Sequence, residues 1–562
     1  TWAASVAVMT TREQTPLDEV ADKYVAGVVA RSPMTATALG LAGDVTALDD
    51  LSPRGLEART NAIRDALRAI EHTALEDQVD VVTKAAMQER LGLELELLEA
   101  GEEHVMLNNL ASPLQELRMT FDLMGQDTVA DWENIAARMA AVPGAIAGYI
   151  ESLQLGAADN SGPFPALRQV EIGINQANEL AGSTSFFTQL NGSKDTPATL
   201  RNELEHAAGT ARRAYSELAE ALTQLMDRAP VADAVGRERY ERFSQQFLGS
   251  RIDLDETYAW GWDELNRIVA EQEAVAAELY GPGTSPEEAM WRLDEEPRYQ
   301  LRGTDALRSW MQSTSDAAID ALSGTHFAIP RPLRELECCI APTNDGGIYY
   351  TGPAADFSRP GRMWWSLPPG VETFASWREK TTVYHEGVPG HHLQAGQAVY
   401  RSGELNKWRS LLCWVSGHGE GWALYAERLM EELGFLADPA DRMGMLDAQR
   451  MRAARVVLDI GVHLVKPCPE EWGGGTWDAD RAWEFLRSNV NMDEAFLRFE
   501  LDRYLGWAGQ APSYKVGQRL WEQARDEAKT KLGEAFDQVE FHRKALDLGS
   551  VGLDLLREVL SG

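Results

Sequence analysis

Apolar residues recur at intervals of three and four along most of the first 325 residues. Segments such as "PLDEVADKYVAGVVARS" (16–32) and "LRNELEHAAGTARRAYSELAEALTQLMDR" (200–228) show this spacing, which places apolar side chains on one face of an α-helix. Breaks rich in Gly, Pro and polar residues, for example "GPGTSP" (281–286), separate successive helices. The pattern predicts a helical N-terminal half, residues 1–325, that serves as scaffold and as one wall of a cleft.

The pattern changes near residue 326, where short stretches rich in aromatic and β-branched residues alternate with Gly and Pro. These stretches are "FAIPRPLRELECCIAP" (327–342), "GGIYYTGPAADF" (346–357) and "GRMWWSLPP" (361–369). They predict a small antiparallel β-sheet. Amphipathic helices then resume, so the predicted fold is mainly α, with the sheet placed before the helix of the candidate site. Residues 326–562 form the second half, and we expect both halves to make one continuous structural unit.

Charge and cysteine content narrow the possible partners and compartment. The 562 residues carry 87 acidic and 53 basic side chains, a formal net charge of −34. Nucleic acid and anionic membrane surfaces would repel such a protein, so we expect neither as a partner. The few cysteines argue against a disulfide framework, the N-terminal segment has no basic leader, and no apolar run is long enough for a membrane helix. We therefore predict a soluble, cytoplasmic protein.

The candidate chemistry centres on "YHEGVPGHHLQ" (384–394), which begins like the zinc motif His-Glu-x-x-His but has Pro389 at the fifth position. Two zinc-binding histidines on a regular helix lie four residues apart. His391 follows His385 by six residues, and His392 by seven, which is about 10 Å along a helix axis. A continuous helix therefore cannot bring either one to the same ion as His385.

The segment "GVPG" (387–390) is unfavourable for a continuous helix, because proline lacks a backbone donor and glycine adds conformational freedom. If two residues loop out, His391 regains the position that a second ligand needs; if three loop out, His392 does. We favour His391 and keep His392 as the alternative. The competing interpretation is a kinked helix with ordinary hydrogen-bonded histidines. Clustering supports a site, since five of the ten histidines lie close together in sequence: His385, His391, His392, His418 and His463.

A zinc site of this kind needs a third protein ligand. The segment "SGHGEGWALYAERLMEELG" (416–434) predicts a helix with Glu420 in its first turn and Glu427 two turns later on the same face. We predict Glu420 as the third ligand of one Zn²⁺ ion, and Glu427 as a residue that orients a ligand histidine. His418 is expected to line the mouth of the site. Both glutamates can also be surface residues, which is the usual position of glutamate in a helix.

Three segments together resemble the marker segments of a bacterial family catalogued as domain of unknown function 885. They are "YHEGVPGHHLQ" (384–394), "GEGWALYAE" (419–427) and "ELDRYLGWAGQAPSYKVG" (500–517), and the resemblance covers most of the chain. It implies a zincin-like, mostly helical fold related to the glutamate-zincins, whose common motif is His-Glu-x-x-His with a downstream Glu. Aligned with "HExGH" of the helical oligopeptidases and carboxypeptidases, His385, Glu386 and His391 take the motif positions, with two extra residues between them.

The roles of the remaining candidates follow from zinc hydrolase chemistry. A carboxylate beside the metal takes the proton of the attacking water, and hydrogen-bond donors stabilise the oxyanion that forms. Glu386 suits the role of general base. Similar helical zinc peptidases use a tyrosine as oxyanion donor, often helped by a histidine; by this analogy Tyr514 is the first candidate and Tyr504 the second. Either tyrosine can instead pack in the core with its hydroxyl on a backbone carbonyl. His463 is a further catalytic candidate, although a core histidine is the simpler interpretation.

The sequence thus predicts a zinc-dependent metallopeptidase that hydrolyses small peptides in a cleft between the two halves. One alternative is a metal-dependent hydrolase of non-peptide amides or esters, because a zinc site does not itself select the acyl group. Another is a catalytically silent peptide-binding protein with the same fold.

Overall fold

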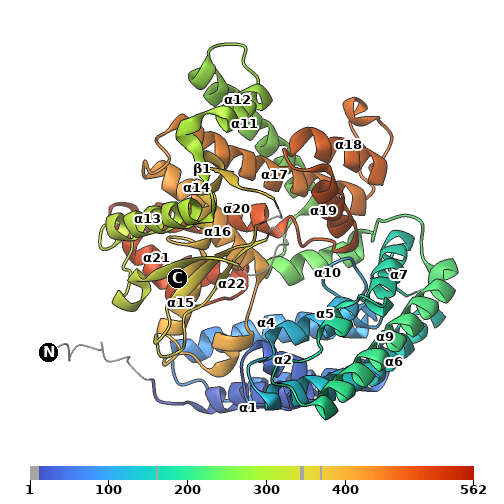
Figure 1. Ribbon diagram of the computed structural model, residues 1–562. Helices are drawn as coiled ribbons and strands as arrows, with labels where there is room; N and C mark the ends of the chain where they lie inside the picture. The colour runs from blue at the N-terminus through green and yellow to red at the C-terminus, as the bar shows by residue number, and fades with distance from the viewer. Residues whose placement is uncertain (1–11, 160–161, 342–346, 368–369, 562) are drawn as a thin grey trace.

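The computed structural model describes residues 12–159, 162–341, 347–367 and 370–561, and it is mainly α-helical (Figure 1). The N-terminal segment for which no basic leader was predicted falls largely on residues 1–11, outside the described residues. The α-helices before residue 326 are α1 (Pro16–Arg31), α2 (Pro33–Ala38), α3 (Pro53–His72), α4 (Gln78–Glu99), α5 (Pro113–Met119), α6 (Val129–Ala158), α7 (Leu167–Ala181), α8 (Phe186–Gln189), α9 (Ala198–Leu225), α10 (Arg237–Leu248), α11 (Leu254–Tyr280), α12 (Pro286–Glu295) and α13 (Thr304–Leu322).

The helices of the second half surround the candidate site. They are α14 (Ser376–Glu386), α15 (His391–Tyr400), α16 (Ser416–Glu432), α17 (Pro439–His463), α18 (Ala479–Asn489), α19 (Glu494–Gly506), α20 (Ser513–Leu532), α21 (Gln538–Asp547) and α22 (Leu553–Ser561). Helix α14 packs against α16 and α17, and α16 packs against α20. The prediction of a mainly α fold is confirmed.

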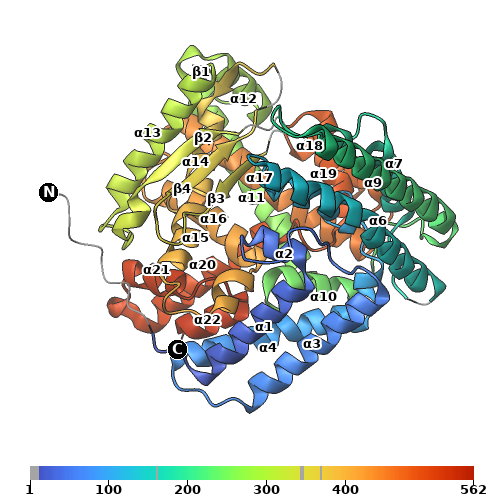
Figure 2. The same ribbon diagram turned by 60° about the horizontal axis from the view of Figure 1, so that its bottom comes forward.

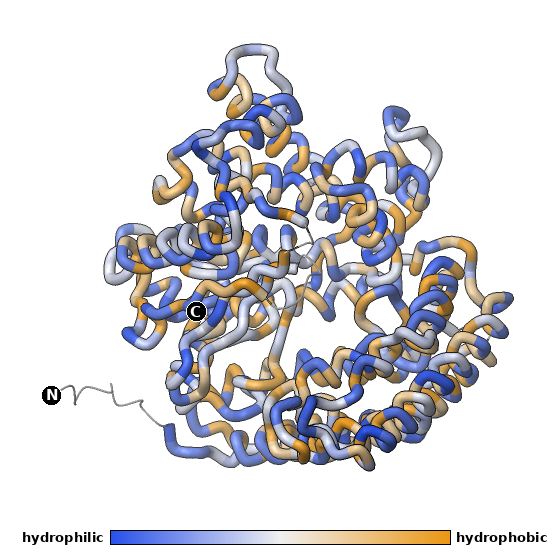
Figure 3. The backbone as a smooth tube through the Cα atoms, in the orientation of Figure 1, coloured by the Kyte–Doolittle hydropathy of each residue, from blue (hydrophilic) through white to orange (hydrophobic). Residues whose placement is uncertain are grey.

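Local sequence explains where many helices begin. Thr15 caps α1 through a capping box with Asp18, and Thr128 caps α6 in the same way with Asp131. Hydrophobic and hydrophilic residues are interspersed along the helices (Figure 3), as expected for elements that bury one face. None of the described helices combines the length and the apolar character that crossing a membrane requires.

Two small sheets account for the strands of the described residues. One pairs β1 (Gln300–Arg302) with β5 (Thr373–Ala375) in antiparallel orientation. The other has the order β2-β4-β3 and contains β2 (Leu336–Ile340), β3 (Ile348–Thr351) and β4 (Gly361–Trp365), which lie side by side in Figure 2.

The expected antiparallel pairing is confirmed for β3 with β4, in which Tyr350 faces Met363, but β2 runs parallel to β4, in which Cys338 faces Met363. The sequence did not predict this parallel pair. The alternation of apolar residues specifies which face of a strand is buried and carries no information about the direction of a neighbouring strand.

The hydrophobic core consists mainly of two clusters. The larger one contains side chains from Leu17 to Leu556 and therefore draws on both sides of residue 325. The smaller one extends from Val105 to Leu222 and holds together α6, α7 and α9, which lie side by side in Figure 1. The division into 1–325 and 326–562 stays a prediction about the chain, while the main core includes residues of both parts.

Candidate metal centre

The first helix of the site ends at Glu386, and a new helix begins at His391. Between them, the Gly387 N–H donates to the Val383 carbonyl at 2.9 Å, and the Gly390 N–H donates to the Tyr384 carbonyl at 3.0 Å. A Cβ atom on Gly390 would lie 1.9 Å from the His385 carbonyl oxygen, so the turn requires glycine there. The predicted interruption at "GVPG" is therefore present, as a break between two helices and not as a bulge in one.

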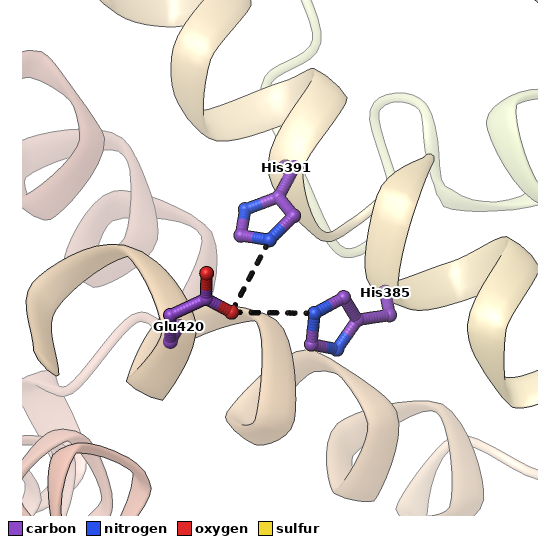
Figure 4. Close-up of side chains that lie close together, drawn as sticks. All are labelled: His385, His391 and Glu420. Carbon is purple, nitrogen blue, oxygen red and sulfur yellow. Dashed lines mark ion pairs between the residues drawn. The ribbon is translucent and has the colours of Figure 1, made fainter. Parts of the chain in front are cut away.

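Three side chains from separate helix ends converge at this break (Figure 4). The Nε2 atoms of His385 and His391 lie 3.5 and 3.6 Å from the same Glu420 carboxylate oxygen. The two imidazole rings are nearly perpendicular, at 88°, with centroids 4.8 Å apart. One ligand atom from each residue lies within 4.8 Å of the others. His385, His391 and Glu420, the three predicted metal ligands, thus face a common point.

The donor types and two of the three ligand separations fit a zinc ion. Two ligands at about 2.1 Å from zinc in tetrahedral geometry lie ~3.4 Å from each other. The two nitrogen–oxygen separations of 3.5 and 3.6 Å agree with this spacing. Two histidine nitrogens and one carboxylate oxygen are also the ligand types of catalytic zinc sites, in which a fourth position stays open.

Helix packing fixes the position of Glu420 at the start of α16. The next residue, Gly421, lies against α20, where an added Cβ would approach the Gly517 carbonyl carbon to 2.4 Å. Only glycine allows the two helices to come this close. Of the two glycines that flank Glu420, Gly421 therefore reflects close packing of α16 on α20, whereas a Cβ on Gly419 would approach the Trp414 ring to 2.4 Å.

His392 does not reach the cluster, although its neighbour His391 does. Its Nδ1 lies 3.0 Å from the Tyr350 hydroxyl, its Nε2 donates to the Leu333 carbonyl at 3.0 Å, and the residue is fully buried. Successive residues of a helix point about 100° apart, so only one of two adjacent histidines can face the cluster. Burial lowers the pKa of His392 to about 4, and the ring is therefore neutral.

Glu427 holds His385 from the side opposite to the cluster. The His385 Nδ1–H donates to a Glu427 oxygen at 2.7 Å, and the other oxygen accepts a hydrogen bond from Thr381 at 2.7 Å. This arrangement leaves Nε2 of His385 directed at Glu420, as expected of a residue that orients a metal ligand. Thr381 was not predicted; its position one helical turn before His385 is the only sequence signal that would have indicated it.

Burial and mutual attraction set the charges in the cluster. Burial disfavours protonation of His385, but Glu420 and Glu427 outweigh it and raise the pKa of His385 to about 10. Burial alone would raise the pKa of Glu420, but the two histidines lower it well below its usual range. The mutual attraction of these groups favours a positive charge at the point that they face, and a metal cation can supply that charge.

Glu386 lies beside the cluster in a buried position. Burial raises its pKa above the ordinary value, and the neighbouring His391 and His385 partly oppose this effect. A carboxylate with a raised pKa accepts a proton more readily near neutral pH than an exposed glutamate does. The role of Glu386 as general base stays a prediction, with which its burial and raised pKa are consistent.

The two tyrosine candidates differ in their surroundings. Tyr514 is partly exposed, and no described residue forms a hydrogen bond with its hydroxyl. Burial and the nearby charge of Glu420 raise the pKa of Tyr514 to about 12, so its hydroxyl keeps its proton. The Tyr504 hydroxyl, in contrast, is buried, accepts a hydrogen bond from Arg455 at 2.6 Å and donates to Glu500. Of the two, Tyr514 is the one available to a substrate.

The remaining histidine candidates lie in the core. His463 is fully buried, donates through Nε2 to the Tyr504 carbonyl at 2.9 Å and packs on Tyr240. His418 lies inside α16 and packs against Trp521 with ring centroids 5.1 Å apart, so it does not line the mouth of the site. Burial lowers the pKa of His418 to about 3. The structure does not bring either histidine to the cluster.

These features define a large, mainly helical protein with a partly buried His-His-Glu cluster at a break between two helices. The chain belongs to the family described as "Bacterial protein of unknown function (DUF885)", which matches residues 33–560. No curated protein sequence matches the chain.

The solved structures that match this chain include two that cover nearly all of it. One is described as "the putative lipoprotein from Colwellia psychrerythraea"; it has a TM-score of 0.81 and 23% identity, and the match covers 97% of this chain and 98% of that one. The other is described as "a putative lipoprotein of unknown function from Shewanella oneidensis"; it has a TM-score of 0.75 and 16% identity, and the match covers 98% and 100% of the two chains.

The predicted cytoplasmic location is wrong, because both structural neighbours are described as a "putative lipoprotein", and a lipid anchor places a protein at a membrane. The prediction relied on the small number of cysteines and on the residues at the start of the chain. A low cysteine count is compatible with any compartment, since a protein with a large core does not need disulfides.

Proposed function

We propose that this protein is a zincin-like, zinc-dependent metallopeptidase that hydrolyses small peptides. The observation that carries the proposal is the convergence of His385, His391 and Glu420 beside the buried Glu386. Two neutral imidazoles and a carboxylate hold zinc, and a second carboxylate next to them is the usual proton acceptor in hydrolysis. The hydrogen bond from the His385 Nδ1–H to Glu427 fixes the orientation of the His385 ring, so that its Nε2 is free to bind the ion.

In this proposal each residue of the chain has a separate task. Zinc bound at the site would act as a Lewis acid that lowers the pKa of water and polarises the scissile carbonyl. Glu386 takes the proton of the attacking water and passes it to the nitrogen of the leaving group. The leaving group therefore departs as a neutral amine. Tyr514 donates its hydroxyl hydrogen to the oxygen that becomes negative in the tetrahedral intermediate.

Replacement of Tyr514 by phenylalanine tests the oxyanion role. We expect kcat to fall by a factor of about 10²–10³ while KM changes little, because the hydrogen bond strengthens only as the oxyanion forms. Steady-state kinetics on a short peptide measures both constants. The matched variant Tyr504→Phe removes a hydroxyl that serves the core, so it should lower the melting temperature and leave the kcat of the folded enzyme close to that of the wild type. The reverse pattern would assign the oxyanion role to Tyr504.

The activity itself is tested with zinc-loaded protein on short peptides and, in parallel, on N-acyl amides and esters of similar size. The proposal expects hydrolysis of the peptides, loss of activity with a chelator and recovery on addition of zinc. Hydrolysis of the non-peptide substrates alone would favour a hydrolase of another acyl class. Binding of peptides without hydrolysis, at full zinc loading, would favour a catalytically silent binding protein.

A further inference from the structure

A group of arginines lies beside the candidate metal centre of a protein whose net charge is −34. Arg452 and Arg455 are three residues apart on α17 and therefore lie on the same face of that helix. The Arg455 guanidinium stacks over the Tyr514 ring at 5.4 Å, and Arg503 comes from α19 to the adjacent Tyr504 ring at 5.2 Å. Arg455 thus contacts the ring of Tyr514, and the charges of Glu420 and of all three arginines act on the pKa of the Tyr514 hydroxyl.

Two of these arginines already share one carboxylate. Arg455 and Arg503 donate to the same Glu500 oxygen at 2.7 and 2.9 Å, and all three side chains are buried. Burial opposes ionisation of Glu500, but the two arginines lower its pKa to about 2, so it is charged. Arg455 also donates to Tyr504, and Arg503 donates to Gln510 at 2.9 Å. The two arginines and Glu500 thus form a hydrogen-bonded unit with one excess positive charge, in which the Arg503 Nε is buried without a hydrogen-bond partner.

Arg452 has no such carboxylate partner. Its Nη1 donates to the Ala448 carbonyl of its own helix at 3.1 Å, and its Nε is buried without a hydrogen-bond partner. No ion pair joins it to any described residue, and its side chain is partly exposed. Its charge nevertheless acts on the catalytic side: the pKa of Tyr514, which burial and Glu420 raise, is lowered by Arg452 as well as by Arg503.

Building on the proposed function, we propose that Arg452 binds a carboxylate of the peptide substrate beside the scissile bond. A guanidinium presents parallel N–H donors that match a carboxylate, and it remains charged when water is excluded from the site. The excess charge of the Arg455–Arg503–Glu500 unit favours the same anion. The carboxylate is either the C-terminus of the peptide, which makes the enzyme a carboxypeptidase, or an acidic side chain next to the cleaved bond.

Four matched peptides separate these two sources. Acetyl-Ala-Ala-Phe as the free acid and as the amide differ only in the terminal carboxylate. Acetyl-Ala-Glu-Phe amide and acetyl-Ala-Gln-Phe amide differ only in the side-chain carboxylate. For the peptide that carries the recognised carboxylate, we expect Arg452→Gln to lower kcat/KM by about 10- to 100-fold, the value of one charged hydrogen-bonded pair. The kcat/KM for the uncharged partner peptide should change little. Arg452→Lys should lower kcat/KM less than Arg452→Gln does, because lysine keeps the positive charge.

Arg442→Gln is the matched control, because Arg442 lies on the same helix and pairs with Glu278, away from the cluster. An equal loss for both peptides of each pair would overturn the inference, since Arg452 would then act only as a countercharge for Glu386 and Glu427. An unchanged kcat/KM for all four peptides in Arg452→Gln would overturn it as well.

Binding to the Glu386→Gln protein, measured by titration calorimetry with the same four peptides, tests the inference without turnover. The inference expects tighter binding of one carboxylate peptide than of its neutral partner, and loss of that difference when Arg452→Gln is added. The absence of any difference in the Glu386→Gln protein would contradict it. If the wild type cleaves no peptide but this binding difference is found, the proposed peptidase function fails and the carboxylate site stands.

Discussion

Replacement of Glu386 by glutamine is expected to lower kcat for peptide hydrolysis by a factor of about 10²–10⁴ without loss of bound zinc. Glutamine has the size of glutamate and cannot accept the proton of the attacking water. Glu386 is not among the three residues whose ligand atoms lie within 4.8 Å of one another, so we expect its change to leave the three ligands in place. Single-turnover kinetics at full zinc loading, together with elemental analysis of the same sample, measures both quantities.

Glu432→Gln provides the control for this experiment. Glu432 lies at the end of α16, where it forms an ion pair with Arg525 at 3.1 Å, and its replacement should change neither kcat nor the zinc content. The assignment of Glu386 as general base would be refuted if Glu386→Gln retained wild-type kcat. Loss of zinc together with activity would instead assign Glu386 to the metal ligands.

The second large effect concerns the two adjacent histidines. His391→Ala should weaken zinc binding by more than the roughly 10- to 100-fold that changes around metal ligands cause, because it removes one of three ligands. His392→Ala should keep zinc and instead lower the melting temperature, since it deletes a buried ring with partners at both nitrogens. Zinc titration against a competing chelator and thermal unfolding of both variants distinguish these outcomes. If His392→Ala lost zinc and His391→Ala kept it, His392 would be the metal ligand and His391 the structural residue.

The sequence predicted much of this centre because the signals are local. Pro389 and its neighbouring glycines are incompatible with a continuous helix, and the structure has a break at that place. Counting residues then left His391, which we favoured, and His392 as the alternative; the structure brings His391 to the cluster, together with Glu420 from the first turn of its helix. Helical periodicity also placed Glu427 on the face of α16 that meets His385.

Other features depend on contacts between residues far apart in the chain. The sequence made Tyr504 a candidate oxyanion donor. In the structure, however, its hydroxyl donates to Glu500 and accepts a hydrogen bond from Arg455, which lies in another helix. The sequence did not indicate Arg452 as a site residue, because a single sequence does not show which arginines have a carboxylate partner. Likewise, the parallel pairing of β2 with β4 follows from the path of the chain through β3 and not from residue types.

The zinc content of the purified wild-type protein tests the central claim most directly. After exhaustive removal of loosely bound metal, elemental analysis should find one zinc ion per chain, and a crystal of that sample should show an anomalous peak at the zinc edge between His385, His391 and Glu420. His385→Ala and Glu420→Ala should each lose the ion and the peak. A wild-type protein that takes up no zinc, or an anomalous peak elsewhere in the molecule, would contradict the account.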